Sequence, residues 1–451
     1  MKTLAQRRKL STLLARKSFA RKSLSADISL CRCSSHWRRT IVKLAWALSL
    51  LLSYNASVAQ PLLPNREVQT QLPGDRVPVG VLHSLSGTMA ISEVAVVNAT
   101  LLAIAEINRA GGVLGRRLQV VLENGASQPA VFAARAEHLL RYEQVAVVFG
   151  GWTSASRRAM KPVFERHNHL LWYPVQFEGF ECSDNIIYSG AQPNQQILPA
   201  LEWALAQGYQ RVYLLGSDYV FPRRANLILR RHIAAQGAEV VAEDYLPLGS
   251  QDFTFLMRTL EETQPDIIFN TLNGDSNVAF FASLEALQHT ADSLPVMSFS
   301  IAEQEAQAIG VARVAGHLAT WNYFQSLDNP ANQRFIAAYR AVHGDDAVIT
   351  DPMAHAYSNV YLWKAAVEAA GSFDPREVRR AAVRLELDTP LGRVRLADNQ
   401  SLEQYSYVGQ LNEAGQFDVL WRSSQRIAPQ PFDPLIIDSP LCSANSRALR
   451  P

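Results

Sequence analysis

The sequence predicts an α/β protein with parallel sheets, organised in two similar halves. Short apolar runs alternate with stretches of helical periodicity from residue 77 to residue 192, and the same alternation restarts after a break and continues to residue 326. Strands that alternate with helices of ten or more residues form βαβ units with parallel strands. A chain of 451 residues is also too long for one ordinary hydrophobic core. We therefore expect two α/β lobes.

The elements of each half follow from the spacing of apolar residues. Each expected helix carries apolar side chains three and four residues apart, which places them on one buried face. In the first half we expect strands at 77–84, 118–122, 145–149 and 169–173, with helices at 92–108, 131–140 and 155–166. In the second half we expect strands at 211–217, 239–246, 266–272 and 295–300, with helices at 199–207, 223–236, 253–263 and 277–287. A strand at 316–323, helices at 331–343, 353–370 and 375–384, and β segments at 392–396 and 405–411 complete the chain.

The charge distribution separates a basic leader from an acidic body. Residues 1–59 contain many Lys and Arg but a single acid, Asp27, so residues 60–451 are net acidic although the whole chain has a formal charge of +2. An acidic body argues against nucleic acid as a partner.

The leader has the pattern of a signal peptide that covers residues 1–59. A basic region ends at Lys43, an apolar core follows at 44–52, and 57–59 (SVA) form a small-x-small cleavage site. Arg38-Arg39 leaves a twin-arginine route possible, although ordinary secretion is favoured. Residues 60–76 are rich in proline and polar residues, and we expect a flexible lead-in there.

The cysteines and motifs exclude several kinds of site. Cys182 and Cys442 remain once the leader is removed, and the sequence leaves open whether they pair. The chain has no P-loop, no G-x-S-x-G, no G-x-G-x-x-G that opens a helix, no HExxH and no Cys/His spacing suited to zinc. We therefore expect no enzyme active site, no cofactor and no metal.

Polar and aromatic residues follow the predicted strands where each strand ends. In an open α/β sheet, ligands bind at the carboxyl ends of the strands. Ser154 and Asp275 have an alternative role as helix caps, and Tyr173 as a core aromatic. These loops contain no nucleophile–base pair, so they suit a pocket for a small, uncharged polar molecule. The candidate ligand-binding residues are Ser86, Trp152, Thr153, Ser154, Tyr173, Gln176, Tyr219 and Asp275.

Six segments of the chain together resemble one known family. They are SLSGTMA, INRAGGVLGRRL, VVFGGWTSASRRAMKPVFE, LLWYPVQFEGFE, GSDYVFPRRAN and FNTLNGDSNVAFF. Over residues 77–430 the chain resembles the urea-binding proteins of ABC-type urea transporters, within the branched-chain-amino-acid-type periplasmic binding proteins. These are similar to the amide receptor of amidase operons. The resemblance implies a type I periplasmic binding fold, in which two Rossmann-like lobes are joined by three hinge crossings and close on the ligand.

The resemblance also implies roles for individual residues. Ser154, Tyr173 and Tyr219 stand where the amide-receptor relatives have pocket residues, and Trp152 matches a pocket-side aromatic. Gln176 and Asp275 are added here because they belong to the urea-type pattern. The chain departs from that pattern at Gly151, where cysteine is usual, and at Asn124-Gly125, where Asp-Gly is usual.

The combined pattern predicts the domains and the function. We expect lobe 1 at 77–192 and 327–385, lobe 2 at 193–326 and 386–435, and a tail at 436–451. The expected function is periplasmic capture of urea or a short-chain amide and its delivery to the permease of an ABC transporter. The alternatives are an amino-acid-binding protein of the same fold, an amide-sensing regulator and, more remotely, an amidohydrolase.

Overall fold

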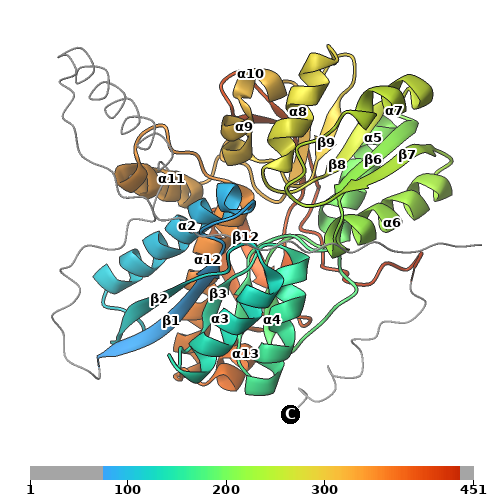
Figure 1. Cartoon of the computed structure of the whole chain (residues 1–451). Coiled ribbons are helices and arrows are strands. Elements are labelled where there is room, and N and C mark those ends of the chain that lie inside the picture. Colours follow the sequence, from blue (N-terminus) through green and yellow to red (C-terminus); the bar gives the residue numbers. More distant parts are fainter. Residues whose placement is uncertain (1–74, 437–451) are drawn as a thin grey trace, which may run out of the picture. The chain divides into compact units, whose positions relative to one another are not determined.

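The structure is a computed structural model that describes residues 75–436. The predicted signal peptide, nearly all of the lead-in and nearly all of the tail lie outside these residues. Within them the chain forms two large sheets, each covered by helices, as Figure 1 shows. The strands of the first sheet are blue to teal, and the strands of the second sheet that carry labels are green to yellow.

The first sheet is entirely parallel, with strand order β2-β1-β3-β4-β5. Its strands are β1 (Arg76–His83), β2 (Arg117–Asn124), β3 (Val148–Gly150), β4 (Leu171–Tyr173) and β5 (Ile186–Tyr188). The strand order turns back at β1, so right-handed crossovers place α2 (Ala90–Arg109) on one face and α3 (Pro129–Arg141) with α4 (Ser154–His167) on the other. The predicted βαβ pattern of the first half is confirmed.

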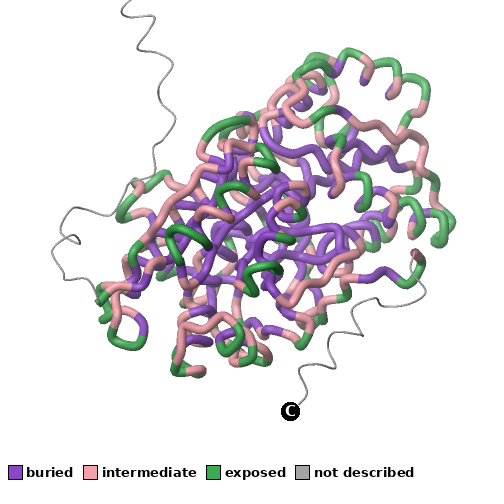
Figure 2. The backbone as a smooth tube through the Cα atoms, turned by 60° about the horizontal axis from the view of Figure 1, so that its bottom comes forward, coloured by how far each residue is buried: buried purple, intermediate pink, exposed green. Residues whose placement is uncertain are grey.

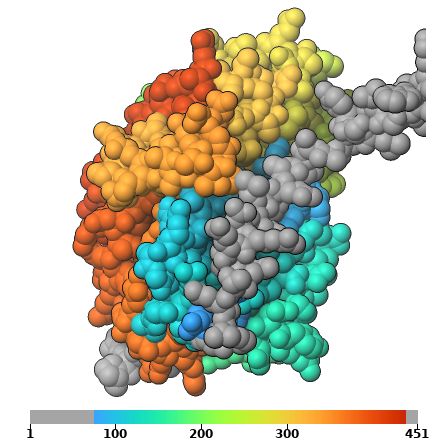
Figure 3. All heavy atoms as spheres, turned by 90° about the vertical axis from the view of Figure 1, so that its left-hand side faces the viewer, coloured from blue at the N-terminus to red at the C-terminus, as the bar shows by residue number. Residues whose placement is uncertain are grey.

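Helix α2 is the central helix of the first lobe. By length and composition it could cross a membrane, but 72% of that apolar stretch is buried in the fold. Helix α12 (Asp351–Ala370) packs along it, and α11 (Pro330–His343) also contacts it. Figure 3 shows this orange segment against the cyan helix, although the two are far apart in the sequence. Burial on both sides explains why α2 is apolar around much of its circumference.

The second sheet has the order β15-β14-β10-β9-β8-β6-β7. Strands β6 to β10 are parallel, and β14 and β15 are antiparallel additions at one edge. The strands are β6 (Arg211–Ser217), β7 (Glu239–Leu246), β8 (Ile267–Thr271), β9 (Val296–Ser298), β10 (Leu318–Trp321), β14 (Tyr407–Leu411) and β15 (Phe417–Arg422). The helices are α5 (Ile197–Ala206), α6 (Val220–Ala235), α7 (Phe255–Thr263), α8 (Ser276–Ala286), α9 (Glu303–Ile309) and α10 (Val311–Val314), preceded by the 3₁₀ turn η2 (Pro193–Gln195).

Two separate cores cover the faces of the second sheet. One contains apolar residues of α7, α8 and α9, and the other contains those of α5 and α6. Figure 2 shows that buried backbone is concentrated along the inner strands. The inner strands are covered on both faces, so every residue of β8 is buried, including the polar Asn270 and Thr271.

A small third sheet affects the lobe boundaries. It has the order β11-β12-β13, with β11 (Glu386–Thr389), β12 (Gly392–Leu396) and β13 (Leu402–Glu403). Val394, Leu396 and Leu402 pack into the core of the first lobe, together with α13 (Pro375–Ala382). We therefore propose that the chain returns to the second lobe after Leu402, later than the expected position 386. This proposed division has the chain pass between the lobes three times: after β5, after β10 and after β13.

Cys182 lies in the loop after β4 and is disulfide-bonded. It is the one cysteine of the described residues, and Cys442 lies outside them. The sequence alone left this pairing open.

Two carboxylates hold the crossing that follows β10. Glu303, at the start of α9 in the second lobe, accepts the Gln325 N–H at 2.7 Å. Asp351, at the start of α12 in the first lobe, accepts the Asn322 N–H at 2.9 Å. Burial raises the pKa of Glu303 to about 8, although the hydrogen bond from Gln325 opposes the rise.

The titration of Glu303 predicts a dependence of stability on pH. Between pH 4.5 and about 8 the folded protein keeps this proton while the unfolded chain loses it. The folded state then binds more protons, so the contribution of Glu303 to stability falls as pH rises, by at most about 1.4 kcal/mol per pH unit. We expect Glu303→Gln, which keeps an acceptor for Gln325, to remove this slope. Unfolding curves at pH 5, 6, 7 and 8 measure it, and parallel pH profiles of wild type and variant would contradict the assignment.

Candidate functional site

Loops from the carboxyl ends of both parallel sheets meet along one line, here called the interlobe seam. It comprises the segments 84–89, 151–154 and 173–178 of the first lobe and 217–219, 273–275 and 299–303 of the second. Four hydrogen bonds cross it, of which the longest joins Gln176 Nε2 to Ser300 Oγ at 3.4 Å. Trp152 Nε1 donates to Asn273 Oδ1 at 3.2 Å, Gln176 Nε2 donates to the Phe299 carbonyl at 2.7 Å, and the Thr88 hydroxyl donates to Asp275 Oδ1.

The loop after β3 presents Thr153 and Ser154 at the start of α4. Thr153, and not Ser154, caps the helix, because its hydroxyl accepts the Ser156 N–H at 3.1 Å. Ser154 is buried, and its hydroxyl oxygen accepts a hydrogen bond from Arg157 Nη1 at 2.9 Å. The side chain of Ser154 is therefore free of the capping role that the sequence allowed.

Tyr173 ends β4 and is fully buried beside Trp152. Its hydroxyl donates to the Trp152 carbonyl. Burial raises the pKa of Tyr173, with Arg157 opposing the rise and Glu178 adding to it. The phenol is thus a neutral group held against the loop after β3.

Tyr219 approaches the same place from the second lobe. It precedes α6 and is partly buried. Burial raises its pKa, the neighbouring Tyr173 and Glu178 add to the rise, and Arg157 opposes it. The Tyr219 hydroxyl is therefore neutral, like that of Tyr173. No hydrogen bond between described residues uses that hydroxyl.

Asp275 and Ser86 differ in their positions. Asp275 precedes α8 but makes no side-chain cap, and its carboxylate is engaged by Thr88 across the seam. Ser86 is exposed, and its hydroxyl accepts from Asn124 Nδ2 at 3.0 Å. Asp275 therefore joins the lobes, whereas Ser86 lies at the rim and apart from the buried residues.

Sequence reasoning missed a buried charge cluster behind the loop after β3. Arg157 is fully buried on α4, donates to Glu178 at 3.3 Å and to Glu181 at 2.9 Å, and lies over the rings of Tyr173 and Phe177. Burial alone would lower the pKa of Arg157, but Glu178 and Glu181 raise it above its ordinary value. Burial acts to raise the pKa of Glu181, but Arg157 outweighs it and the pKa is lowered. Arg157 and Glu181 are therefore both charged at neutral pH.

The remaining contacts of the cluster tie it to its surroundings. Arg158 Nη2 also binds Glu178, at 2.9 Å, although the Arg158 side chain is 39% exposed. Tyr188 donates to Glu181 at 2.9 Å. The cluster thus joins α4, the loop after β4 and β5.

Two buried acceptors on the loop after β4 have no partner among the described residues. They are Gln176 Oε1 and Glu178 Oε2. A buried polar atom without a hydrogen bond costs about 1–3 kcal/mol, so such atoms usually meet a ligand or water. Both acceptors therefore suit a ligand that carries N–H or O–H donors.

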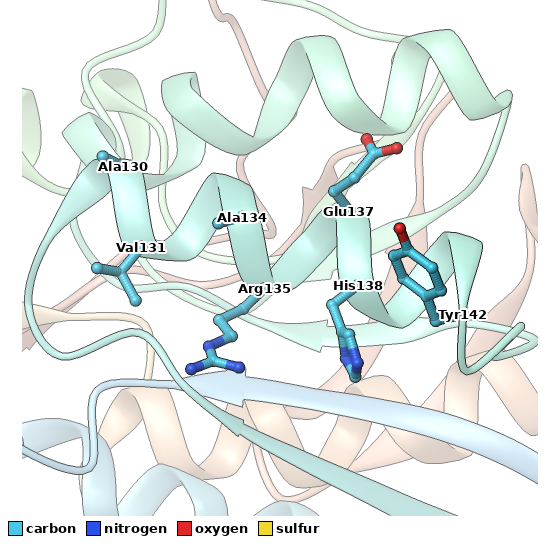
Figure 4. A pocket seen from close by; sticks show the side chains of 7 residues that line it. All are labelled: Ala130, Val131, Ala134, Arg135, Glu137, His138 and Tyr142. Carbon is cyan, nitrogen blue, oxygen red and sulfur yellow. The ribbon is translucent and has the colours of Figure 1, made fainter.

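No group of three or more His, Cys, Asp or Glu side chains within residues 75–436 is placed to hold a metal ion. A hollow of about 500 Å³ lies elsewhere, along α3 (Figure 4). Its lining residues all belong to α3 or follow it directly, so it lies outside the seam; they are Ala130, Val131, Ala134, Arg135, Glu137, His138 and Tyr142.

Gly151, where the chain departs from the urea-type pattern, lies against Tyr173. Its φ is +83°, and a Cβ there would lie 2.9 Å from Met160 Cε and 3.3 Å from the Tyr173 ring. We expect Gly151→Ala to lower the free energy of unfolding by about 1 kcal/mol more than Gly208→Ala. Gly208 is the matched control, because it also has positive φ (+96°) but nothing within 4 Å of its Cβ position. Guanidinium chloride unfolding measures both, and equal losses would show that the contacts with Met160 and Tyr173 are unimportant.

Comparisons with known proteins agree with this architecture. Residues 77–436 match the periplasmic binding protein domain family. The Leu/Ile/Val-binding protein homolog 6 of Brucella suis is 23% identical over 295 residues, which is 64% of this chain and 75% of that protein. A limonene hydroxylase of Geobacillus stearothermophilus is 32% identical over 141 residues, but the match spans 31% of this chain and only 25% of that protein.

A solved structure supports the fold. The solute-binding protein of an ABC transporter from R. palustris, in complex with benzoate, superposes with a TM-score of 0.72 at 18% identity, covering 79% of this chain and 98% of that one. The match of residues 77–436, together with this likeness, shows that the chain belongs to the periplasmic binding protein family and has its type I fold.

Proposed function

We propose that the protein is a periplasmic solute receptor that captures urea or a short-chain amide and delivers it to the permease of an ABC transporter. Family membership supports the periplasmic location and the role in transport. The observation that carries the choice of ligand is the pair of buried acceptors without partners, Gln176 Oε1 and Glu178 Oε2. Urea offers four N–H donors and one carbonyl acceptor, so it has a donor for each of these acceptors.

The other seam residues fit the remaining surface of such a ligand. The hydroxyls of Tyr219 and Ser154 can donate to its carbonyl, and the rings of Trp152 and Tyr173 can cover its flat faces. The loops contain no nucleophile with an adjacent base, which agrees with capture and release without chemistry.

An amino acid is the second candidate ligand, because the related Brucella protein is named for leucine, isoleucine and valine. Its ammonium group would suit Glu178, but its carboxylate has only single hydroxyl protons, such as those of Ser154 and Tyr219, as free side-chain donors among the candidate residues. The buried Arg157 is neutralised by two carboxylates. A benzoate ligand, as in the R. palustris protein, meets the same difficulty. We therefore favour the neutral amide.

A thermal-shift panel tests this proposal. The purified mature protein is heated with urea, acetamide, formamide, isoleucine, leucine or benzoate. We expect the neutral amides to raise the melting temperature, since a ligand at 100 times its Kd stabilises the folded state by about 2.7 kcal/mol. A shift with isoleucine or benzoate and none with the amides would contradict the proposal.

A further inference from the structure

We infer that contacts within the protein determine which side chains of the seam donate hydrogen bonds to the ligand and which accept them. Arg157 is the positioning residue that makes Ser154 a donor to the ligand. This inference rests on the proposed function and specifies how the site selects its ligand. It follows from counting, for each polar side chain, which donor or acceptor is already engaged within the protein.

Ser154 is assigned as a donor by its contact with Arg157. A hydroxyl has one proton to donate, and a guanidinium can only donate. Because Arg157 Nη1 donates to Ser154 Oγ at 2.9 Å, the Ser154 proton must point away from Arg157. No acceptor for this proton is present among the described residues, and the side chain is buried. The proton is therefore available to a carbonyl oxygen of the ligand.

Three other side chains are assigned as acceptors. The Tyr173 hydroxyl gives its only proton to the Trp152 carbonyl, so its oxygen can only accept. Gln176 donates through Nε2 to the Phe299 carbonyl, which leaves Oε1 free. Glu178 uses Oε1 for Arg157 and Arg158, which leaves Oε2 free.

These four side chains thus offer one donor and three acceptors. This pattern is complementary to a small molecule with one carbonyl and several N–H groups. It opposes a carboxylate of the same size, which has acceptors only and would meet the Glu178 charge. Acetamide and acetate have nearly the same shape and differ in this respect, so they form a matched pair of ligands.

A double variant distinguishes a role of Arg157 in orienting Ser154 from a purely structural role. If Arg157 acts through Ser154, then Arg157→Lys and Ser154→Ala remove the same interaction, and their effects on ligand affinity do not add. A structural defect would instead weaken binding in either background. Ser154→Thr keeps a hydroxyl at this position and should preserve binding.

Calorimetric titration of the mature protein with urea, acetamide and acetate tests the inference. We expect urea and acetamide to bind and acetate to give no heat. We expect Ser154→Ala and Arg157→Lys each to weaken urea binding about tenfold, the double variant to be no weaker than either, and Ser154→Thr to stay within about threefold. Arg166→Lys is the control, because this exposed arginine of the same helix bonds Glu137 and should bind urea like the wild type.

The outcomes separate the inference from the proposed function. No urea or acetamide binding by the wild type would overturn both. Urea binding with equal acetate binding, with no loss in Ser154→Ala, or with additive losses in the double variant would overturn the inference alone. Far-ultraviolet circular dichroism checks that Arg157→Lys is folded. If this variant is not folded, the comparison of acetamide with acetate and the two Ser154 variants still test the inference.

Discussion

Replacing Arg157 with methionine is expected to lower the free energy of unfolding by about 3–5 kcal/mol. The reason is that Glu178 is fully buried and Glu181 almost so, and both would lose their buried cation. A buried charge without a partner is far more costly than the net contribution of the intact pair. Guanidinium chloride is the appropriate denaturant. Urea is the proposed ligand, so its binding would stabilise the folded state and oppose its own effect as a denaturant.

Arg158→Met is the matched control for this prediction. Arg158 follows Arg157 on the same helix and approaches the same two glutamates, but its side chain is 39% exposed. Exposed ion pairs contribute about 0–1 kcal/mol, so the control should lose no more than that. Similar small losses for both variants would show that burial does not distinguish the two arginines.

Replacing Gly190 with alanine is expected to cost about 2–3 kcal/mol of stability and to abolish measurable urea binding. Gly190 follows β5, and a Cβ there would lie 2.1 Å from the Val175 carbonyl carbon and 2.5 Å from the Gln176 nitrogen. Both are backbone atoms, so the loop after β4 would have to move. This loop carries Gln176 and Glu178, whose acceptors are central to the proposed site.

Gly80→Ala provides the comparison for Gly190→Ala. Gly80 lies in β1, and its Cβ would meet methyl groups of Leu139 and Val148 at 3.1 Å. Side chains can change conformation to make room where backbone atoms cannot. We therefore expect the free energy of unfolding to fall by about 1 kcal/mol and the urea affinity to stay unchanged. Unfolding curves and calorimetry on both variants measure these effects. Normal urea affinity in Gly190→Ala would show that the loop position is not important for binding.

Much of the fold follows from the sequence because apolar periodicity determines which faces are buried. The helix expected at 92–108 is α2, Ala90–Arg109, and the strand expected at 211–217 is β6, Arg211–Ser217. The lobe boundary near residue 386 was harder to predict. Strands of a small sheet look alike in sequence whichever lobe they pack on, and the packing of Leu402 in the first core is the reason for the later boundary that we propose.

The sequence predicts which loops form the candidate site, but not the hydrogen-bond partners of their residues. Ligands bind at the carboxyl ends of strands, and this rule predicted the positions of Trp152, Gln176 and Asp275. Their contacts across the seam depend on how the lobes meet, which the sequence does not give. The spacing of apolar residues in the sequence also predicts that Arg157 is buried. It lies three residues before Met160 and seven before Phe164, which places it on the apolar face of α4, whereas Arg158 does not share that spacing.

The central claim is that the seam binds a neutral amide, and calorimetric titration of the purified mature protein with urea tests it most directly. We expect saturable, one-site binding of urea that is unaffected by an excess of isoleucine. No heat with urea, acetamide or formamide, or displacement of urea by isoleucine, would contradict the claim.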